Sequence, residues 1–469
     1  MRQIYEIAPK DEMDLIHEKS LDLLETTGVA FSCEEALEIF KKHGCKVDGE
    51  TVFIPRELVA KAMSTVPAKF DWYGRNGNFV TVGGGETVHT PAYGPMFVLD
   101  QDQYRFPTCK DFADFCKLDE TSDVISTGNA NILDQPEVPL AERGKYISAA
   151  TLLYLTKPIM GDVDGKERSL NAIKMTKEFY DVTDDRCFLS GLIDVASPLH
   201  YTQAMAEGLI EYAKAGQAVV ITGTSISGLT VPDTMASGLL VVNTENLAGI
   251  VLSQLVNPGT PVVYGNQGHG SDLRHSSLSI GSPEDSLFYH VTKSFGMYYN
   301  MPVRCGGSLT DSKYVDMQAG FESFNSAYAT IHAGTDHMIH TCGILDTFNS
   351  VSYEKYMIDE ENIKQIKRFI RGIHVDEKAL MIEKIKKAGP MGNFIARTSK
   401  EYKENYNLPK LPIRINHGQW IDANKPSIID NAHAAKEKRL EEYTLQPLEA
   451  FQKKIIESTL SKEHIFAEI

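Results

Sequence analysis

Polar and aromatic side chains recur directly after short apolar runs between residues 82 and 352. They are Asn129 and Asn131, Asp162 and Asp164, Asp194, Thr222 and Thr224, Tyr264 with Asn266, Gln267 and His269, Arg304, His340, and Phe348 with Asn349. Amides, hydroxyls and aromatic rings dominate this set, and clustered carboxylates are scarce. Groups of this kind bind and orient a small polar molecule, so we expect a site that works mainly by positioning.

The same set gives little support for a metal or a covalent nucleophile. His337 and His340 form an H-x-x-H, but on a strand positions i and i+3 face opposite sides. His269 and His275 flank a glycine loop and would make at most a loose ligand pair. Cys305 at a strand end fits a small buried wall residue better than a nucleophile. We therefore predict no bound metal and no tightly bound cofactor.

Several of these residues have a structural alternative of similar weight. Asp162 and Asp164 can cap the helix that follows them. Asn129 can hold loop backbone, and Tyr264 can belong to the core.

Eight apolar runs that alternate with helix-length segments must position these side chains. The runs are TVHTPAYGPMFVLD, DVISTGNANIL, KPIMGDVDG, RCFLSGLIDVASPL, AVVITGTSISG, PVVYGNQGHG, MPVRCGGSLTD and HMIHTCGILDTFNS. Strand followed by helix, repeated eight times, predicts an α/β fold, a (β/α)8 TIM barrel, over residues 82–352. A doubly wound sheet is the rival, but it would need a glycine fingerprint at its first strand–helix turn, and the sequence has none there. The carboxyl ends of barrel strands carry the active site, and the polar set follows those ends.

The segments that flank the predicted barrel have a different character. Residues 1–81 suggest an N-terminal helical extension, and residues 353–469 a C-terminal helical extension packed on the barrel. In the latter, Ile363, Ile366 and Ile370 recur at helical spacing on one face.

Three consecutive glycines, Gly83 to Gly85, precede the first run in the stretch VGGGETVHTPAYGPMFVLD. A phosphate-binding loop would open a helix at once, but Pro91, Gly94 and Pro95 follow instead. We expect the glycines to let the first barrel strand pass close to its neighbours, and the following loop to bring Tyr93 and Phe97 to the mouth. A plain hairpin bulge is the alternative.

Composition narrows the range of partners. The chain has 469 residues and a formal net charge of −16, which argues against nucleic acid and anionic membranes as partners. The N-terminus has no apolar signal region, and the most apolar helix, 236–256, is interrupted by Asn243, Glu245 and Asn246. Seven scattered cysteines without a C-x-x-C pair fit reduced thiols, and we expect a cytoplasmic protein.

Five stretches together resemble the trimethylamine methyltransferase superfamily, in its branch without pyrrolysine. They are GGGETVHTPAYGP, GLIDVASPL, GNQGHGSDLR, GGSLTDSKYVDMQAGFES and SYEKYMIDEENI. The resemblance implies a (β/α)8 barrel that moves a methyl group from a methylated amine to the Co(I) corrinoid of a partner protein. Because this chain has ordinary residues where the founding members carry pyrrolysine, it implies a quaternary amine such as glycine betaine, proline betaine, carnitine or γ-butyrobetaine. We also expect a homo-oligomer.

This chemistry suits the residues at the strand ends. A quaternary ammonium leaves as a neutral amine, so the reaction needs orientation and a cation pocket rather than an acid, a base or a metal. We expect Tyr93, Phe97, Tyr264 and Phe348 to form the cation pocket and Arg304 to bind the carboxylate, with Asn129, Asp194, His269 and His340 positioning the substrate. Two alternatives remain: a barrel lyase or hydrolase acting on a small carboxylate through Asp162, Asp194 or His269, and a non-catalytic quaternary-amine binding protein.

Overall fold

A closed ring of eight parallel strands forms the centre of the molecule. The computed structural model describes residues 7–268, 270–394 and 399–467. The ring strands are β6 (Val88–His89), β9 (Gly128–Asn129), β10 (Ile159–Met160), β11 (Leu189–Ala196), β13 (Ala218–Thr224), β14 (Val262–Asn266), β17 (Val303–Arg304) and β18 (His337–Met338). They pair in the order β9-β10-β11-β13-β14-β17-β18-β6. The Ser126 amide donates to the His89 carbonyl over 2.7 Å and closes the ring between β9 and β6.

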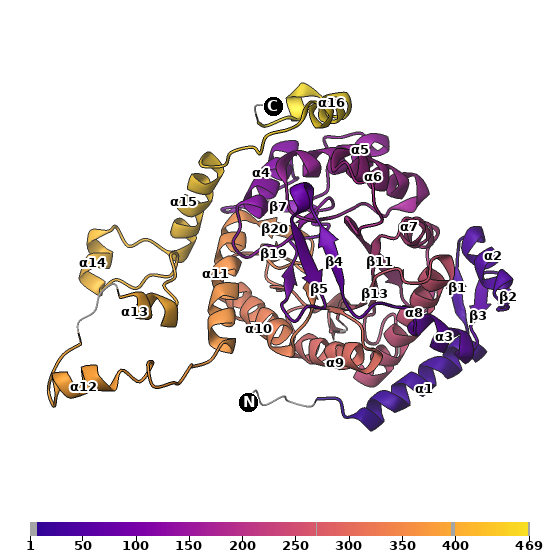
Figure 1. Ribbon diagram of the computed structural model, residues 1–469, viewed down its shortest axis with the longest axis horizontal. Helices are drawn as coiled ribbons and strands as arrows, with labels where there is room; N and C mark the ends of the chain where they lie inside the picture. The colour runs from indigo at the N-terminus through magenta and orange to yellow at the C-terminus, as the bar shows by residue number, and fades with distance from the viewer. Residues whose placement is uncertain (1–6, 269, 395–398, 468–469) are drawn as a thin grey trace.

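One helix follows each strand, which confirms the predicted (β/α)8 barrel (Figure 1). The helices are α4 (Cys109–Glu120), α5 (Leu140–Tyr154), α6 (Gly165–Phe179), α7 (Gln203–Lys214), α8 (Met235–Val256), α9 (Pro283–Tyr299), α10 (Met317–Ala333) and α11 (Tyr353–Ile370). Side-chain caps set several starts; Ser282, for example, accepts from the Asp285 amide and Pro283 is the first residue of α9. Since α11 completes the helix ring, the C-terminal extension begins after Ile370 rather than at residue 353.

Helix α8 is the apolar segment expected from the sequence. By length and composition it could cross a bilayer, but 78% of its most apolar window is buried inside the protein. It packs on β13 and β14 and on the N-terminal helices α1 (Lys10–Thr26) and α3 (Arg56–Met63).

The N-terminal segment is not purely helical, so that prediction was wrong. Besides α1, α2 (Glu34–Lys42) and α3 it contains β1 (Val29–Phe31), β2 (Lys46–Asp48), β3 (Thr51–Phe53), β4 (Phe70–Tyr73), the 3-10 turn η1 (Arg75–Gly77) and β5 (Phe79–Val82). Strand β1 runs parallel to β12 (His200–Tyr201), the short strand after β11, and so extends the barrel sheet.

The β4–β5 hairpin closes the amino-terminal end of the barrel. The Tyr73 amide donates to the carbonyl of Cys187, just before β11, over 2.8 Å. Trp72 is fully buried in one cluster with Val88, Leu192 and Val263 from the strands. Figure 1 shows the hairpin across the centre of the ring. The predicted boundary between residues 81 and 82 therefore cuts through β5, which belongs with the barrel.

Two small sheets lie in the loops that follow barrel strands. One has the order β19-β20-β7-β8 and joins the loops after β6 and β18. Its strands are β7 (Phe97–Asp100), β8 (Gln103–Arg105), β19 (Ile344–Leu345) and β20 (Ser350–Ser352). The other is the hairpin of β15 (Ser271–Asp272) and β16 (Ser277–Leu278), after β14.

The C-terminal extension has an anchored part and a projecting part. Helix α15 (Ile428–Glu441) contacts α11 and α4, and α16 (Ala450–Thr459) packs on α5 and α6 ahead of the 3-10 turn η2 (Lys462–His464). Helices α12 (Ile382–Ala388), α13 (Lys400–Asn405) and α14 (His417–Asp422) stand away from the barrel at the left of Figure 1.

Candidate functional site

The barrel interior has an apolar lower layer and a polar upper layer. Because side chains alternate along a strand, Leu192 and Asp194 of β11 both face inward while Ile193 packs outward. The lower layer, at the amino ends of the strands, consists of Trp72, Val88, Met160, Leu192, Val220 and Val263. The upper layer, at the carboxyl ends, contains Tyr93, Asp194, Thr222, Arg304, His337 and His340.

Asp194 carries the negative charge of the upper layer. Its side chain is exposed although β11 is a central strand covered by helices outside, so the barrel interior is open to solvent at this level. The surrounding protein nevertheless raises the pKa of Asp194 through desolvation, and the positive charge of Arg304 opposes that rise. Its carboxylate makes no ion pair within 4.0 Å among the described residues.

Arg304 carries the opposite charge and is fully buried. Its Nη1 donates to the Oε1 atom of Gln267 and lies 3.5 Å from Thr222 Oγ1. Within the described residues, Nε and Nη2 have no hydrogen-bond partner. Burial lowers the pKa of Arg304 to about 10, so the guanidinium stays charged at neutral pH. Nε and Nη2 are adjacent donors on one edge, the arrangement that binds a carboxylate in two places.

An aromatic group completes the upper layer. Tyr93 packs against the lower layer, and its backbone amide donates to His340 Nδ1 over 3.3 Å. The ring of Phe348 lies 4.7 Å from that of His340, centre to centre. Burial and the charge of Arg304 lower the pKa of His340 far below its usual value, so its imidazole is neutral. The structure thus brings Tyr93, His340 and Phe348 together near Asp194, whose negative charge also acts on Tyr93.

Two other predicted site residues, Tyr264 and Phe97, pack on rings outside this group. Tyr264 points outward from β14, donates to Asn243 Oδ1 of α8 over 2.9 Å and stacks on Phe295 of α9. The prediction that Tyr264 lines the mouth is therefore wrong, because strand alternation places it on the outer face. Phe97 starts β7, and its ring packs on that of Phe106 at 5.2 Å, centre to centre.

Asn129 is committed to loop backbone. Its amide donates to the Ala92 carbonyl over 2.7 Å, and its oxygen accepts from the Asn131 amide over 2.9 Å. This matches the structural alternative and makes Asn129 a support for the loop that carries Tyr93. His269 lies outside the described residues.

The glycine stretch turns the chain between the hairpin and the first barrel strand. Gly83 and Gly85 have φ values of +83° and +95°, which other residues rarely adopt. A Cβ atom on Gly83 would lie 2.5 Å from the Ala68 carbonyl oxygen. These glycines therefore allow a tight turn and a close approach after β5, rather than the passage of a barrel strand past its neighbours. Tyr93 follows on the loop after β6, as expected.

Two supporting groups were not predicted as site residues. Gln267 and Thr222 hold one side of Arg304. Glu245 of α8 accepts from Leu199 N over 2.7 Å and from Ser197 Oγ over 2.9 Å, and so fixes the turn after β11. Burial raises the pKa of Glu245 to about 7. The polar interruption of α8 was visible in the sequence, but its contact with the β11 turn was not.

Asp162, one of the acids proposed for a lyase, is arranged for structure. Asp162 accepts from Arg168 Nε over 2.5 Å and from the Asp164 amide over 3.2 Å, which ties the end of β10 to the first turns of α6. Asp194 and Arg304 are the opposed charges of the upper layer, and the neighbouring histidines are held neutral by burial. Such a site can bind a zwitterion and orient it; this favours positioning over proton transfer.

Comparison with known proteins places the whole chain in one family. The family model described as Trimethylamine methyltransferase matches residues 1–462. The chain belongs to the trimethylamine methyltransferase family. The glycine betaine methyltransferase of Desulfitobacterium hafniense (strain Y51) is 35% identical over 446 residues, or 94% of this chain and 93% of that one. The proline betaine:corrinoid and L-carnitine:corrinoid methyltransferases of Eubacterium limosum are 36% and 33% identical, each over 97% of both chains.

A solved structure supports the same fold. The monomethylamine methyltransferase of Methanosarcina barkeri aligns with a TM-score of 0.51 over 94% of each chain, at 11% sequence identity. The overall fold is therefore shared with that protein.

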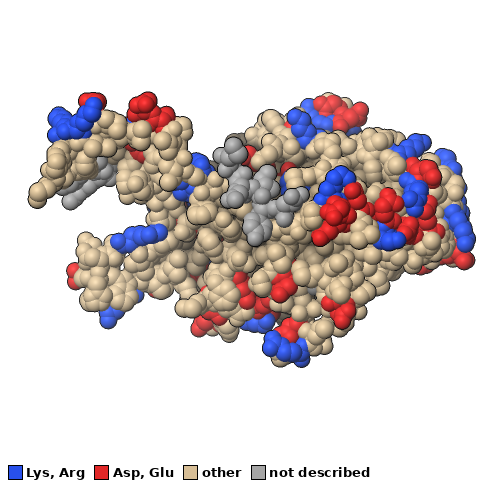
Figure 2. Space-filling model, turned by 90° about the horizontal axis from the view of Figure 1, so that it is seen from below, with Lys and Arg blue, Asp and Glu red and all other residues tan. Residues whose placement is uncertain are grey.

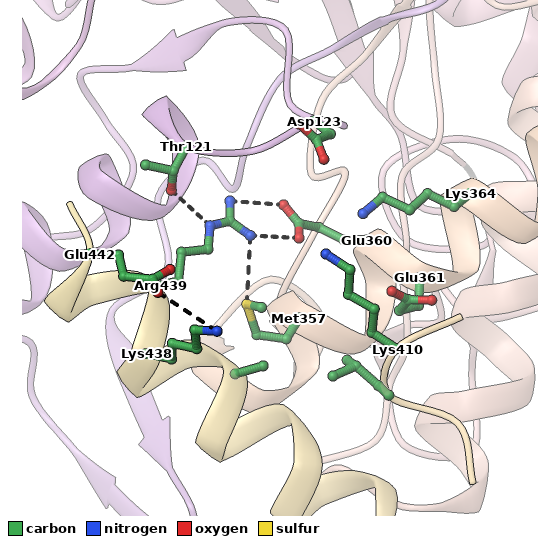
Figure 3. Close-up of a pocket in the computed structure, with 12 residues that line it drawn as sticks. Thr121, Asp123, Met357, Glu360, Glu361, Lys364, Lys410, Lys438, Arg439 and Glu442 are labelled. Atoms are coloured by element: carbon green, nitrogen blue, oxygen red, sulfur yellow. Dashed lines mark hydrogen bonds and ion pairs between the residues drawn. The ribbon is translucent and has the colours of Figure 1, made fainter. Parts of the chain in front are cut away.

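This member of the trimethylamine methyltransferase family also has a charged cavity outside the barrel. The cavity, about 470 Å³, lies between α11, α15 and the segment at Lys410 (Figure 3). Its charged lining residues are Asp123, Glu360, Glu361 and Glu442 with Lys364, Lys410, Lys438 and Arg439. Arg439 Nη1 lies 2.7 Å from Glu360 Oε2, and Figure 3 shows the guanidinium facing that carboxylate. The four acidic and four basic side chains balance in charge. We therefore interpret the cavity as part of the contact that holds α15 against the barrel.

One group in the family member has the composition of a metal site. Ligand atoms of Asp100, Glu354 and His433 lie within 4.8 Å of one another where β7, α11 and α15 meet. Glu354 Oε1 is 2.8 Å from His433 Nδ1, and Arg105 Nη2 is 3.4 Å from Asp100 Oδ2. Because these side chains contact one another and Arg105, they too join the C-terminal extension to the barrel.

Proposed function

We propose that this protein transfers a methyl group from a quaternary amine of the betaine type to the Co(I) corrinoid of a partner protein. The observation that carries the proposal is the pair of opposed charges in the upper layer, neither of which has an ion-pair partner among the described residues. A betaine has a quaternary ammonium and a carboxylate, and Asp194 and Arg304 offer one charge to each. Three relatives are named for glycine betaine, proline betaine and L-carnitine, and each of these compounds carries both groups.

The ammonium binds beside Asp194 and the Tyr93 ring. Aromatic faces attract such a cation by about 0.5–2 kcal/mol each, and Phe348 adds a second ring beside His340. The substrate carboxylate binds the Nε and Nη2 edge of Arg304. That edge is buried, whereas Asp194 is exposed. Substrate binding therefore requires the Arg304 side chain, or the residues that cover it, to move toward the open space at Asp194.

The transfer itself needs no proton from the protein. The methyl–nitrogen bond breaks, its electron pair stays on the nitrogen, and a neutral tertiary amine leaves as the electron pair of Co(I) bonds to the methyl carbon. The upper layer orients the methyl group toward the carboxyl-terminal end of the barrel, where the corrinoid protein can approach. The partner carries the corrinoid, and we propose that the reaction takes place in the cytoplasm.

The corrinoid spectrum tests this function. The chain is mixed with its reduced corrinoid protein and separately with glycine betaine, proline betaine, carnitine and γ-butyrobetaine. We expect the Co(I) absorption to convert to that of methylated cobalt with at least one of them, and the demethylated tertiary amine to accumulate in equal amount. A corrinoid that stays Co(I) with every betaine, but reacts with trimethylamine, would overturn the betaine assignment.

A further inference from the structure

We propose that the segment 371–427, here called the arm, packs against a second copy of this chain. Its apolar side chains would enter the groove between α10, α11 and the start of α15 of that copy. The observation behind this is that, of its described residues 371–394 and 399–427, Leu411 alone is buried within its own chain.

The arm cannot be stable by itself. Helices α12, α13 and α14 have six or seven residues and contain no buried residue. Isolated helices shorter than about 12–15 residues are marginal in water, and helices in proteins are stabilised mostly by packing. Ile373 is 87% exposed, and Ile382 and Ile385 of α12 are 42% and 53% exposed. Figure 2 shows the projecting part standing away from the body. The arm therefore needs a surface to cover it.

A suitable surface lies at the base of the arm. A groove of about 780 Å³ is lined by Met317, Phe321, Phe324 and Tyr328 of α10, Ile358 of α11, and Ile428. Met317 is 87% exposed and Phe321 is 63% exposed. Exposed apolar residues in one groove mark an interaction site.

Charge favours another copy of the same chain as the occupant. The arm has eleven Lys and Arg against six Asp and Glu, whereas the whole chain has 47 against 63. The basic arm of one copy is therefore complementary in charge to the acidic remainder of another copy. In the groove, Lys355 is neutralised by Asp359 at 2.6 Å, which leaves Asp316 as an exposed acid. Helix α12 presents Lys384, Lys386 and Lys387 beside its isoleucines.

The position of the groove fits a reciprocal exchange. The arm ends at Ser427, and the next residue, Ile428, lines the groove. A two-fold axis beside α15 would therefore let each arm reach the groove of the other copy, which closes the assembly. The groove lies on the outer helix layer, so the exchange leaves the barrel mouth open to a corrinoid protein.

Sedimentation of the full-length chain tests the exchange. The groove variant is Phe321→Glu and the arm variant is Ile382→Glu with Ile385→Glu. The matched control is Leu170→Glu, since Leu170 is 45% exposed on α6 outside the arm and groove. We expect dimers or larger assemblies for the wild type and the control, and monomers for the groove and arm variants. Far-ultraviolet circular dichroism checks that the barrel remains folded in each.

Mixing the variants adds a second, stricter test. A mixture of arm variant and groove variant retains one intact arm facing one intact groove, so it should partly recover the dimer, while each variant alone should not. A monomeric wild type would overturn the proposal. This holds even if the wild-type chain then associates with the corrinoid protein. An assembly that survives in the arm variant would also overturn it. Loss of the assembly in the arm variant but not the groove variant would overturn the groove as the acceptor.

Discussion

The lower and upper layers of the barrel interior are built on the same eight strands, but the lower layer is mainly apolar and the upper layer is polar and charged. The lower layer joins Trp72 of the hairpin to Val88, Met160, Leu192, Val220 and Val263, and apolar packing fills it. The upper layer holds Asp194 and a buried Arg304, two of whose nitrogens have no partner in the part of the chain that the structure describes. The described residues also leave Trp72 Nε1 of the lower layer unpaired, but the upper layer combines unpaired donors with opposed charges. We therefore propose that the lower layer stabilises the fold and the upper layer binds the substrate.

The largest expected effect is in the lower layer. Trp72→Ala should lower the free energy of unfolding by about 3–5 kcal/mol, because it removes a fully buried aromatic side chain from the β4–β5 hairpin, the plug that closes the amino-terminal end of the barrel. Phe79→Ala on the same hairpin is the control: Phe79 is 56% exposed, and its replacement should change stability by about 0.5 kcal/mol or less. Chemical denaturation measures both. Equal losses would mean that the hairpin does not plug the barrel through Trp72.

The pH dependence of stability probes the rim of the upper layer. Burial raises the pKa of Glu245 from 4.5 to about 7, so its ionisation opposes folding. The stability that this group contributes is fully present below about pH 4.5 and is lost as the pH rises through about 7. The loss is at most roughly 3 kcal/mol.

Glu245→Gln copies the protonated side chain and should remove this loss. It should match the wild type at pH 5 and be more stable at pH 8, as followed by thermal unfolding. A wild type and a variant with parallel pH profiles would show that Glu245 is not held protonated by the fold.

Arg304→Gln should separate activity from stability. We expect kcat/KM for the preferred betaine to fall by about 2–3 kcal/mol in transition-state free energy, the size of a charged hydrogen bond. Stability should stay the same or rise, since a desolvated cation is removed. The control substrate is tetramethylammonium, which has no carboxylate and should be unaffected. If the variant mainly loses stability and keeps its preference for betaines, Arg304 is part of the scaffold.

Tyr93→Leu should have the smallest effect of the series. Loss of the aromatic face should raise KM by about 1 kcal/mol, or several-fold, with a smaller change in kcat, because the ammonium charge disappears during transfer. Phe97→Leu is the matched control, since the ring of Phe97 packs on that of Phe106. Equal effects of the two changes would contradict the assignment of Tyr93 to the substrate.

The sequence predicted the barrel well because alternating strands and helices are a local pattern. All eight predicted runs contain a ring strand, and Tyr93, Asp194, Arg304 and His340 face the upper layer. Tyr264 was misplaced because β14 is buried on both faces, and an apolar run such as Val262–Asn266 does not reveal which side faces inward. The hairpin plug was missed because it depends on a long-range contact between Tyr73 and Cys187. Gln267 and Glu245 gained roles only from contacts across the fold.

Calorimetric binding without the corrinoid protein tests the central claim, that the upper layer is a zwitterion site, most directly. Wild-type chain and the variant with both Asp194→Asn and Arg304→Gln are titrated with each betaine, with tetramethylammonium and with acetate. We predict that the wild type binds at least one betaine at least tenfold more tightly than either single-charge ligand, and that the double variant loses this preference. Tetramethylammonium binding as tightly as every betaine, or an unchanged preference in the double variant, would contradict the account.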